Sequence, residues 1–160
     1  MPRPSLARSV TEPSRVYFDT SYLVRLYFRD LGWETVREMA ATDHLACAIH
    51  GRAEMIAAFH RKLRDGAIRP VQYAALLDQA AADDAEEAIR WVPLSPATLT
   101  KVAAVYAALP ASIFLRAADA LHLATAAEQG LTTIYSNDHH LLAAARHFGL
   151  SGRNVIPTGL

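Results

Sequence analysis

The sequence predicts an α/β fold of three layers, in which a central, mostly parallel sheet of four to five strands lies between helices. The main observation is that short β-branched or aromatic runs alternate with helical segments along the 160-residue chain. Hydrophobic residues make up 52% and charged residues 20% of the chain, which fits a globular protein and excludes a disordered one. We expect one domain over residues 16–157, after a flexible tail, Met1–Arg15.

Several features restrict the class of protein. The tail is not followed by the apolar segment of a secretory signal, and no apolar run reaches the roughly 18 residues that span a membrane. Cys47 is the only cysteine, so an internal disulfide is excluded and a reducing cytoplasmic location is expected. The formal net charge of zero gives no overall attraction to nucleic acid, so RNA binding requires a local basic strip.

The first predicted strand ends in an acid. Val16–Asp19 is the strand, and Asp19-Thr20-Ser21 supplies capping residues for a helix over 22–28. A second helix is expected over about 33–42, after Gly32. Open α/β sheets bind ligands at the carboxyl ends of their strands, so Asp19 is a candidate ligand-binding residue as well as a helix cap.

The middle of the chain predicts two more strands. The segment 45–49 is a buried strand that runs through His50-Gly51 into a helix over 53–60, where Glu54 lies in the first turn favoured by the helix dipole. The basic cluster 61–64 ends this helix, and a further helix is expected over 70–88. A strand over 89–94 is followed by a helix over 97–109, for which Ser95 and Pro96 are typical starting residues.

The segment Arg116–Ala126 predicts an apolar helix with one carboxylate, Asp119, in its middle. A buried carboxylate must be paired or bound to a metal. This helix is expected to end at Gly130 and to be followed by a strand over 131–135, after which come Ser136-Asn137-Asp138. A helix over 139–148 and a final strand over 154–157 complete the prediction.

The acids predict a common site. The carboxyl ends of parallel strands lie at one edge of a sheet, so Asp19, Glu54 and Asp138 are expected to converge there with Asp119. Four carboxylates repel one another unless a cation is present, and oxygen ligands suit Mg²⁺ or Mn²⁺. Such a centre favours hydrolysis of a phosphodiester by a metal-activated water.

These motifs resemble the PIN domain family and, within it, the VapC toxins of bacterial toxin–antitoxin pairs. The likeness extends from about Val16 to Pro157 and is most specific over Arg116–Ala126. It implies a Mg²⁺-dependent endoribonuclease toxin, in which a Thr, a Ser and an Asn support four catalytic and metal-binding acids. The acids are Asp19, Glu54, Asp119 and Asp138. The supporting residues are Thr20, Ser136 and Asn137, of which Thr20 is expected to orient Asp19. It further implies an RNA substrate, transfer RNA being common among relatives, a cognate VapB-like antitoxin and a homodimer.

The sequence departs from the family pattern at two places. His50-Gly51 stands where Ser or Thr is common, and Ser136-Asn137-Asp138 replaces a Thr-x-Asp motif. Neither departure removes a carboxylate.

Histidines offer a different mechanism. Asp119 and His122, three residues apart, are a possible metal pair, and two histidines can act as acid and base in a metal-free ribonuclease. The sequence contains no His-x₃-His pair or Cys partner that completes a zinc set. We therefore interpret His122 as a packing or hydrogen-bonding residue.

The Asp19 motif argues against two other functional classes. A phosphotransferase of the dehalogenase type needs a second acid at the position where this chain has Ser21. A dinucleotide-binding domain needs a glycine-rich first turn, and Asp19-Thr20-Ser21 contains no glycine. A non-catalytic interaction module of the same fold stays open, and it predicts that Asp19→Asn leaves function unchanged.

Four arginines are candidates for contacting a nucleic acid near the acids: Arg25, Arg29, Arg116 and Arg146. Each also fits a surface or capping role. Arg116 is the best candidate, because it lies one helical turn from Asp119 and can hold a phosphate or an antitoxin carboxylate.

Overall fold

The computed structural model describes residues 15–157 and contains one five-stranded, fully parallel sheet in the order β3-β2-β1-β4-β5. The strands are β1 (Arg15–Phe18), β2 (His44–Ala48), β3 (Ile89–Val92), β4 (Thr133–Tyr135) and β5 (Ser151–Arg153). The predicted α/β class and parallel sheet are confirmed. The tail predicted over Met1–Arg15 lies outside the described residues except for Arg15, which begins β1.

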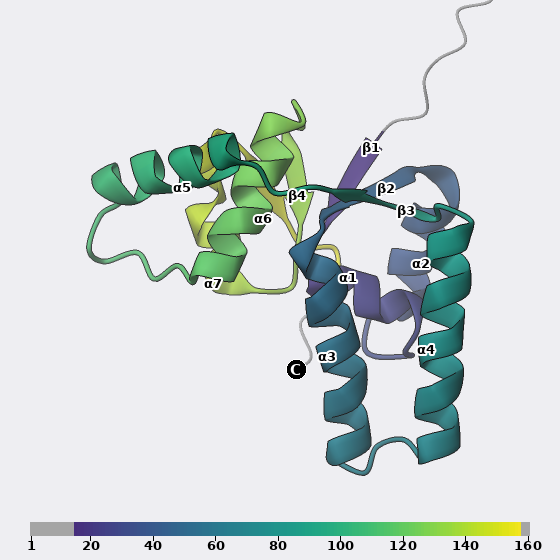
Figure 1. Ribbon diagram of the computed structural model, residues 1–160. Coiled ribbons are helices and arrows are strands. Elements are labelled where there is room, and N and C mark those ends of the chain that lie inside the picture. The colour runs from purple at the N-terminus through teal and green to yellow at the C-terminus, as the bar shows by residue number, and fades with distance from the viewer. Residues whose placement is uncertain (1–14, 158–160) are drawn as a thin grey trace, which may run out of the picture.

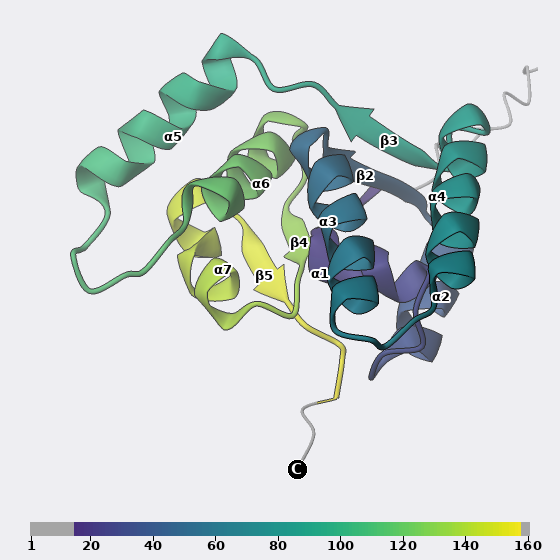
Figure 2. The same cartoon turned by 60° about the horizontal axis from the view of Figure 1, so that its bottom comes forward.

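Helices cover both faces of the sheet, as the two views in Figures 1 and 2 show. On one face lie α1 (Thr20–Leu23), α2 (Trp33–Thr42), α3 (His50–Arg64) and α4 (Pro70–Ala85). On the other face lie α5 (Pro96–Ala108), α6 (Ala117–Glu128) and α7 (His139–Ala144). Short 3₁₀ helices, η1 (Val24–Leu26) and η2 (Ala145–Phe148), follow α1 and α7.

The strand order indicates where a ligand would bind in this sheet, which is beside β1. The chain passes from β1 outward through β2 and β3, and then returns to the other side of β1 as β4 and β5. In open parallel sheets, ligands bind at the carboxyl ends of the strands where the order reverses, which here is between β1 and β4. Phe18 is opposite Tyr135 in this pair, so Asp19 and Ser136 follow their strands at the same level.

The helix after β1 begins earlier than the predicted range of 22–28. The Asp19 side chain accepts a hydrogen bond from the Tyr22 backbone N–H, which caps α1 at Thr20. The segment then continues as η1 from Val24 to Leu26.

The last strand was predicted at the wrong place. β5 is Ser151–Arg153 and not 154–157. Gly149 ends η2 in the left-handed conformation (φ +75°), and the chain pairs with β4 directly afterwards. Asn154 instead accepts a hydrogen bond from the Tyr22 hydroxyl at 2.8 Å. The side chain of Asn154 therefore fixes the exit from the sheet.

The core explains the apolar character of the Asp119 helix. Helix α6 packs against β2 and β4 on one side and against α5 on the other, so most of its residues are buried. Large aromatic side chains, Tyr17, Phe18, Tyr22 and Phe59, fill the core around β1 and α3. Within residues 15–157, no helix combines the length and apolar content needed to cross a membrane.

Candidate carboxylate active site

Asp19 is buried at the carboxyl end of β1, with only 4% of its surface exposed. One carboxylate oxygen accepts hydrogen bonds from the Ser21 hydroxyl (2.6 Å) and the Tyr22 backbone (3.3 Å). The other accepts from the Ser136 hydroxyl at 2.5 Å. Burial raises the pKa of Asp19, although these hydrogen bonds oppose the shift. The charge of Asp19 is therefore held in place at a cost in stability.

Asp119 and Asp138 share one cationic partner, Arg116. The Arg116 Nε donates to Asp119 Oδ2 at 2.9 Å, and its Nη2 donates to Asp138 Oδ2 at 2.7 Å. Asp119 is 6% exposed, whereas the Arg116 side chain is 58% exposed, so the guanidinium lies over the two acids at the surface. The two carboxylates therefore lie close enough to hold a single positive charge between them.

Ser136 and Asn137 join the two strand ends. The Ser136 hydroxyl donates to Asp19 and accepts from the Asp138 backbone N–H at 2.9 Å. The Asn137 backbone N–H donates to the Ser21 hydroxyl, also at 2.9 Å. These hydrogen bonds join the segment after β4 to the turn that contains Asp19. The Ser136 side chain contacts both the Asp19 carboxylate and the Asp138 backbone.

Glu54 lies in the second turn of α3 and not in the predicted first turn, because the helix begins at His50. It has partners of its own. Its Oε1 accepts from the Thr20 hydroxyl at 2.9 Å and lies 2.6 Å from His122 Nε2. Burial favours neutral Glu54, but the hydrogen bonds from His122 and Thr20 outweigh it and lower the pKa of this carboxyl. Thr20 therefore orients Glu54 and not Asp19, because its side chain points toward α3; the predicted partner of Thr20 was wrong.

His122 connects Glu54 to the interior of the protein. The His122 ring is buried between β1 and α3, and its Nδ1 lies 2.6 Å from the Tyr17 hydroxyl. The Tyr17 oxygen accepts from the Ala48 backbone N–H at 2.9 Å. Burial lowers the pKa of His122, but Cys47 and Glu54 more than offset this effect and raise it to about 10. His122 pairs with Glu54, and this geometry agrees with the predicted hydrogen-bonding role.

His50 is a neighbour of the acids that was not predicted. Its Nε2 lies 3.6 Å from Glu54 Oε1, one helical turn away, and 3.0 Å from the Ala118 carbonyl. The i, i+4 spacing of His50 and Glu54 on one helix was the available signal. Burial, and then the neighbouring His122, lower the pKa of His50.

The close packing around position 51 explains why this residue is a glycine. A Cβ at this position would lie 2.5 Å from Cys47 Sγ and 3.1 Å from His122 Cε1. The start of α3 therefore approaches β2 and α6 more closely than any residue with a side chain allows. This contact brings Glu54 to the ring of His122.

The other candidate arginines have structural partners. Arg25 is 8% exposed, and its guanidinium donates to the carbonyls of Ser21 and Leu31. Arg29 lies over the ring of Trp33, 5.2 Å from its centroid. The side chain of Arg146 reaches its neighbour His147 at 3.5 Å. Of the four, Arg116 is the one that contacts the predicted acids.

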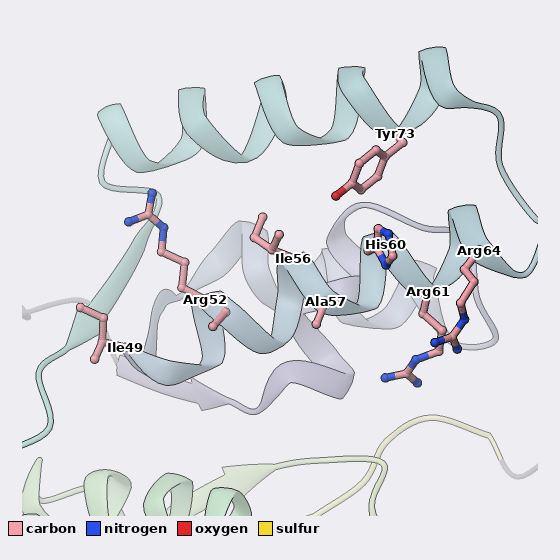
Figure 3. Close-up of a pocket in the computed structure, with 9 residues that line it drawn as sticks. Ile49, Arg52, Ile56, Ala57, His60, Arg61, Arg64 and Tyr73 are labelled. Carbon is pink, nitrogen blue, oxygen red and sulfur yellow. The ribbon is translucent and has the colours of Figure 1, made fainter.

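A basic groove runs along α3, and Tyr73 of α4 lines one side of it (Figure 3). It has a volume of about 910 Å³ and combines cationic with apolar side chains. Its lining includes Arg52, Ile56, His60, Arg61, Arg64 and Tyr73. The basic cluster 61–64 lies at the end of α3, and two of its arginines, Arg61 and Arg64, also line this groove. Glu54 lies on the same helix.

The fold and the acidic edge define a doubly wound α/β protein with a carboxylate centre at the point where the strand order reverses. Residues 16–147 match the sequence profile of the PIN domain. The chain belongs to the PIN domain family. A search of curated proteins finds no match.

Solved structures with the same fold include three bacterial proteins. VapBC2 from Rickettsia felis, bound to a DNA fragment from its promoter, has a TM-score of 0.63 at 14% identity, covering 88% of this chain and 98% of that one. VapC20 from Mycobacterium tuberculosis, a toxin that cleaves the sarcin–ricin loop, has a TM-score of 0.63 at 18% identity, covering 82% of this chain and 95% of that one. FitAcB from Neisseria gonorrhoeae has a TM-score of 0.63 at 15% identity, covering 86% of this chain and 95% of that one. The TM-scores show a shared fold, and at these low identities the likeness shows the fold alone.

Proposed function

We propose that this protein is a divalent-metal-dependent endoribonuclease of the VapC type, in which Asp19, Asp119 and Asp138 hold Mg²⁺ or Mn²⁺ with Glu54 beside them. The observation that carries the proposal is the Arg116 guanidinium, which bridges Asp119 and Asp138 next to the buried Asp19. Membership of the PIN domain family supports a nuclease, and the RNA-cleaving VapC20 shares the fold.

The residues fit a hard divalent cation. All the acids offer carboxylate oxygens, which Mg²⁺ and Mn²⁺ prefer. Asp119 and Asp138 already share one positive charge, that of Arg116. Asp19 keeps lone-pair capacity beyond its hydrogen bonds from Ser21, Ser136 and the Tyr22 backbone. A bound metal would lower the pKa of a water and stabilise charge on a phosphate oxygen.

The protein's own side chains orient this centre. Ser21 and Ser136 fix the two oxygens of Asp19, and Thr20 and His122 fix Glu54. Arg116 is exposed and has further N–H groups that can bind a phosphate. The groove with Arg61 and Arg64 supplies local positive charge that the neutral chain as a whole does not.

The proposed partners are RNA and a VapB-like antitoxin that blocks the acidic centre. VapBC2 of Rickettsia felis is the structural neighbour that supports the antitoxin. Transfer RNA as the substrate, and a homodimer, stay predictions.

The test is cleavage of RNA by the purified protein with and without metal. We expect EDTA to abolish cleavage, Mg²⁺ or Mn²⁺ to restore it, and the products to carry 5′-phosphate ends. Asp119→Asn should remove cleavage and also relieve growth arrest on expression, with the fold retained by circular dichroism. Unimpaired cleavage in EDTA, or cyclic phosphate products, would contradict the proposal.

Arg116→Ala should increase the stabilisation that Mg²⁺ gives to the protein. Removing the guanidinium leaves two carboxylates without their cation, so a metal no longer competes with it for Asp119 and Asp138. We expect a loss of about 1–3 kcal/mol in the metal-free state, because the buried Asp119 carboxylate loses its charged partner. The Mg²⁺-induced rise in melting temperature should exceed that of the wild type.

Arg52→Ala is the matched control, because Arg52 forms an ion pair with Asp84 at similar exposure and away from the centre. Differential scanning fluorimetry with and without Mg²⁺ measures both variants. An equal Mg²⁺ response in Arg116→Ala and the wild type would contradict competition between Arg116 and the metal.

A further inference from the structure

A second group of metal-ligand side chains lies beside the aspartates. One ligand atom each from His50, Glu54 and His122 lie within 4.8 Å of one another. His50 and Glu54 come from successive turns of α3, and His122 comes from α6 on the other face of the sheet. Each of the two histidine Nε2 atoms approaches the same Glu54 oxygen, at 3.6 Å and 2.6 Å.

The donor set differs in chemistry from the aspartates. Two imidazole nitrogens and one carboxylate oxygen are a set that Zn²⁺ and similar transition metals prefer, whereas Mg²⁺ prefers oxygen alone. Metal bonds of about 2.0–2.1 Å in a tetrahedron place ligand atoms roughly 3.3 Å apart. The 3.6 Å pair fits this spacing already, and the 2.6 Å pair must open by roughly 0.7 Å once a metal replaces the shared proton.

The ring of His122 is held as a metal ligand would be. Its Nδ1 contacts the Tyr17 hydroxyl, which the Ala48 backbone N–H fixes in turn. A hydrogen bond on one ring nitrogen orients the other nitrogen toward its ligand. Nε2 therefore points at Glu54, and the absence of a side chain at Gly51 leaves room for the ring.

His50 is free to exchange its partner. Its Nε2 has one hydrogen bond, to the Ala118 carbonyl, and its buried Nδ1 has none among residues 15–157. A metal on Nε2 would replace this one hydrogen bond, and the ring proton that Nε2 now donates to Ala118 would move to Nδ1 or be released. The Glu54 side chain is 34% exposed, so an ion can enter from solvent.

We propose that His50, Glu54 and His122 form a binding site for a Zn²⁺-class transition-metal ion, and that its occupation inhibits the nuclease by withdrawing Glu54 from the carboxylate centre. The binding follows from the geometry of the three side chains. The inhibition rests on the proposed function. The two parts therefore need separate measurements.

The binding test titrates the purified full-length protein with Co²⁺ alone, a spectroscopic substitute for Zn²⁺. We expect one equivalent to give the visible absorption of tetrahedral Co²⁺, which Zn²⁺ removes and excess Mg²⁺ does not. His50→Gln should weaken this binding at least about tenfold, because one of three ligands is lost. His60→Gln, the same substitution further along α3, should bind like the wild type. Glu54→Gln is a second variant of the site.

The inhibition test adds Zn²⁺ to RNA cleavage assays that contain Mg²⁺. We expect stoichiometric Zn²⁺ to lower cleavage by the wild type at least about tenfold. Cleavage by His50→Gln, compared with that variant's own rate without Zn²⁺, should fall much less. Absence of tetrahedral Co²⁺ binding, or unchanged binding by His50→Gln, would overturn the site. Binding without inhibition of an active enzyme would overturn the regulatory role. Binding by a protein that cleaves no RNA supports the site and refutes the proposed function instead.

Discussion

Asp19→Asn is expected to lower RNA cleavage at least about 100-fold, because even the outer partners of metal ligands contribute 10–100-fold to metal affinity or activity. The fold should persist, since the asparagine oxygen can still accept a hydrogen bond from the Tyr22 backbone and cap α1. The measurement is the initial rate of cleavage in Mg²⁺, with circular dichroism on the same sample. Asp78→Asn, an exposed acid on α4, is the control and should retain full activity.

The same substitution is expected to raise the stability of the metal-free protein at neutral pH. Burial raises the folded-state pKa of Asp19, so the folded protein binds this proton more tightly than the unfolded chain. The associated stability is present below the ordinary aspartate pKa and is lost as the pH rises through the raised folded value. At pH 7 the wild type therefore carries a buried charge that Asp19→Asn lacks.

Melting temperatures in EDTA at several pH values measure this effect. Each kcal/mol gained should raise the melting temperature by about 2–4 °C in a chain of this length. The difference between Asp19→Asn and the wild type should shrink as the pH falls toward the usual aspartate range. A non-catalytic protein predicts instead that function is unchanged in this variant, so retained cleavage or retained toxicity would refute the nuclease.

Tyr17→Phe is expected to destabilise the protein by about 3 kcal/mol, because two buried polar groups lose their partner. The Tyr17 hydroxyl is fully buried and contacts both the Ala48 backbone N–H and His122 Nδ1. A loss of this size lowers the melting temperature by about 6–12 °C. At temperatures well below the melting transition, the rate of RNA cleavage should also fall, since His122 then orients Glu54 less firmly.

Tyr106→Phe is the matched control for Tyr17→Phe. It removes the same hydroxyl from a tyrosine that is 38% exposed and donates to the Leu115 carbonyl. Water can replace that partner, so the expected loss is about 1 kcal/mol or less. Equal melting temperatures for the two variants would show that the Tyr17–His122–Glu54 network does not stabilise the protein.

The sequence by itself determined the architecture and the acids at its edge. Alternating strands and helices and the Asp19 and Ser95 caps are local signals, and each appears in the structure close to its predicted place. The position of Asp19 and Asp138 after parallel strands follows from the same local pattern. The final strand was misplaced because strand pairing with β4, a contact between distant segments, selects Ser151–Arg153 over the more apolar run that follows.

Only the tertiary structure decided how the acids are partnered. Glu54 and His122 are 68 residues apart, and they meet because α6 packs on β2 at the point where Gly51 allows α3 to approach. Thr20 binds Glu54 and not its neighbour Asp19, and Arg116 spans two aspartates from different elements. Local propensity places a side chain on an element, but which of several nearby charges it contacts depends on the packing of those elements. The segment Arg116–Ala126 illustrates both points. Its apolar sequence predicted burial, and the fold directed two of its polar side chains, Asp119 and His122, to different partners.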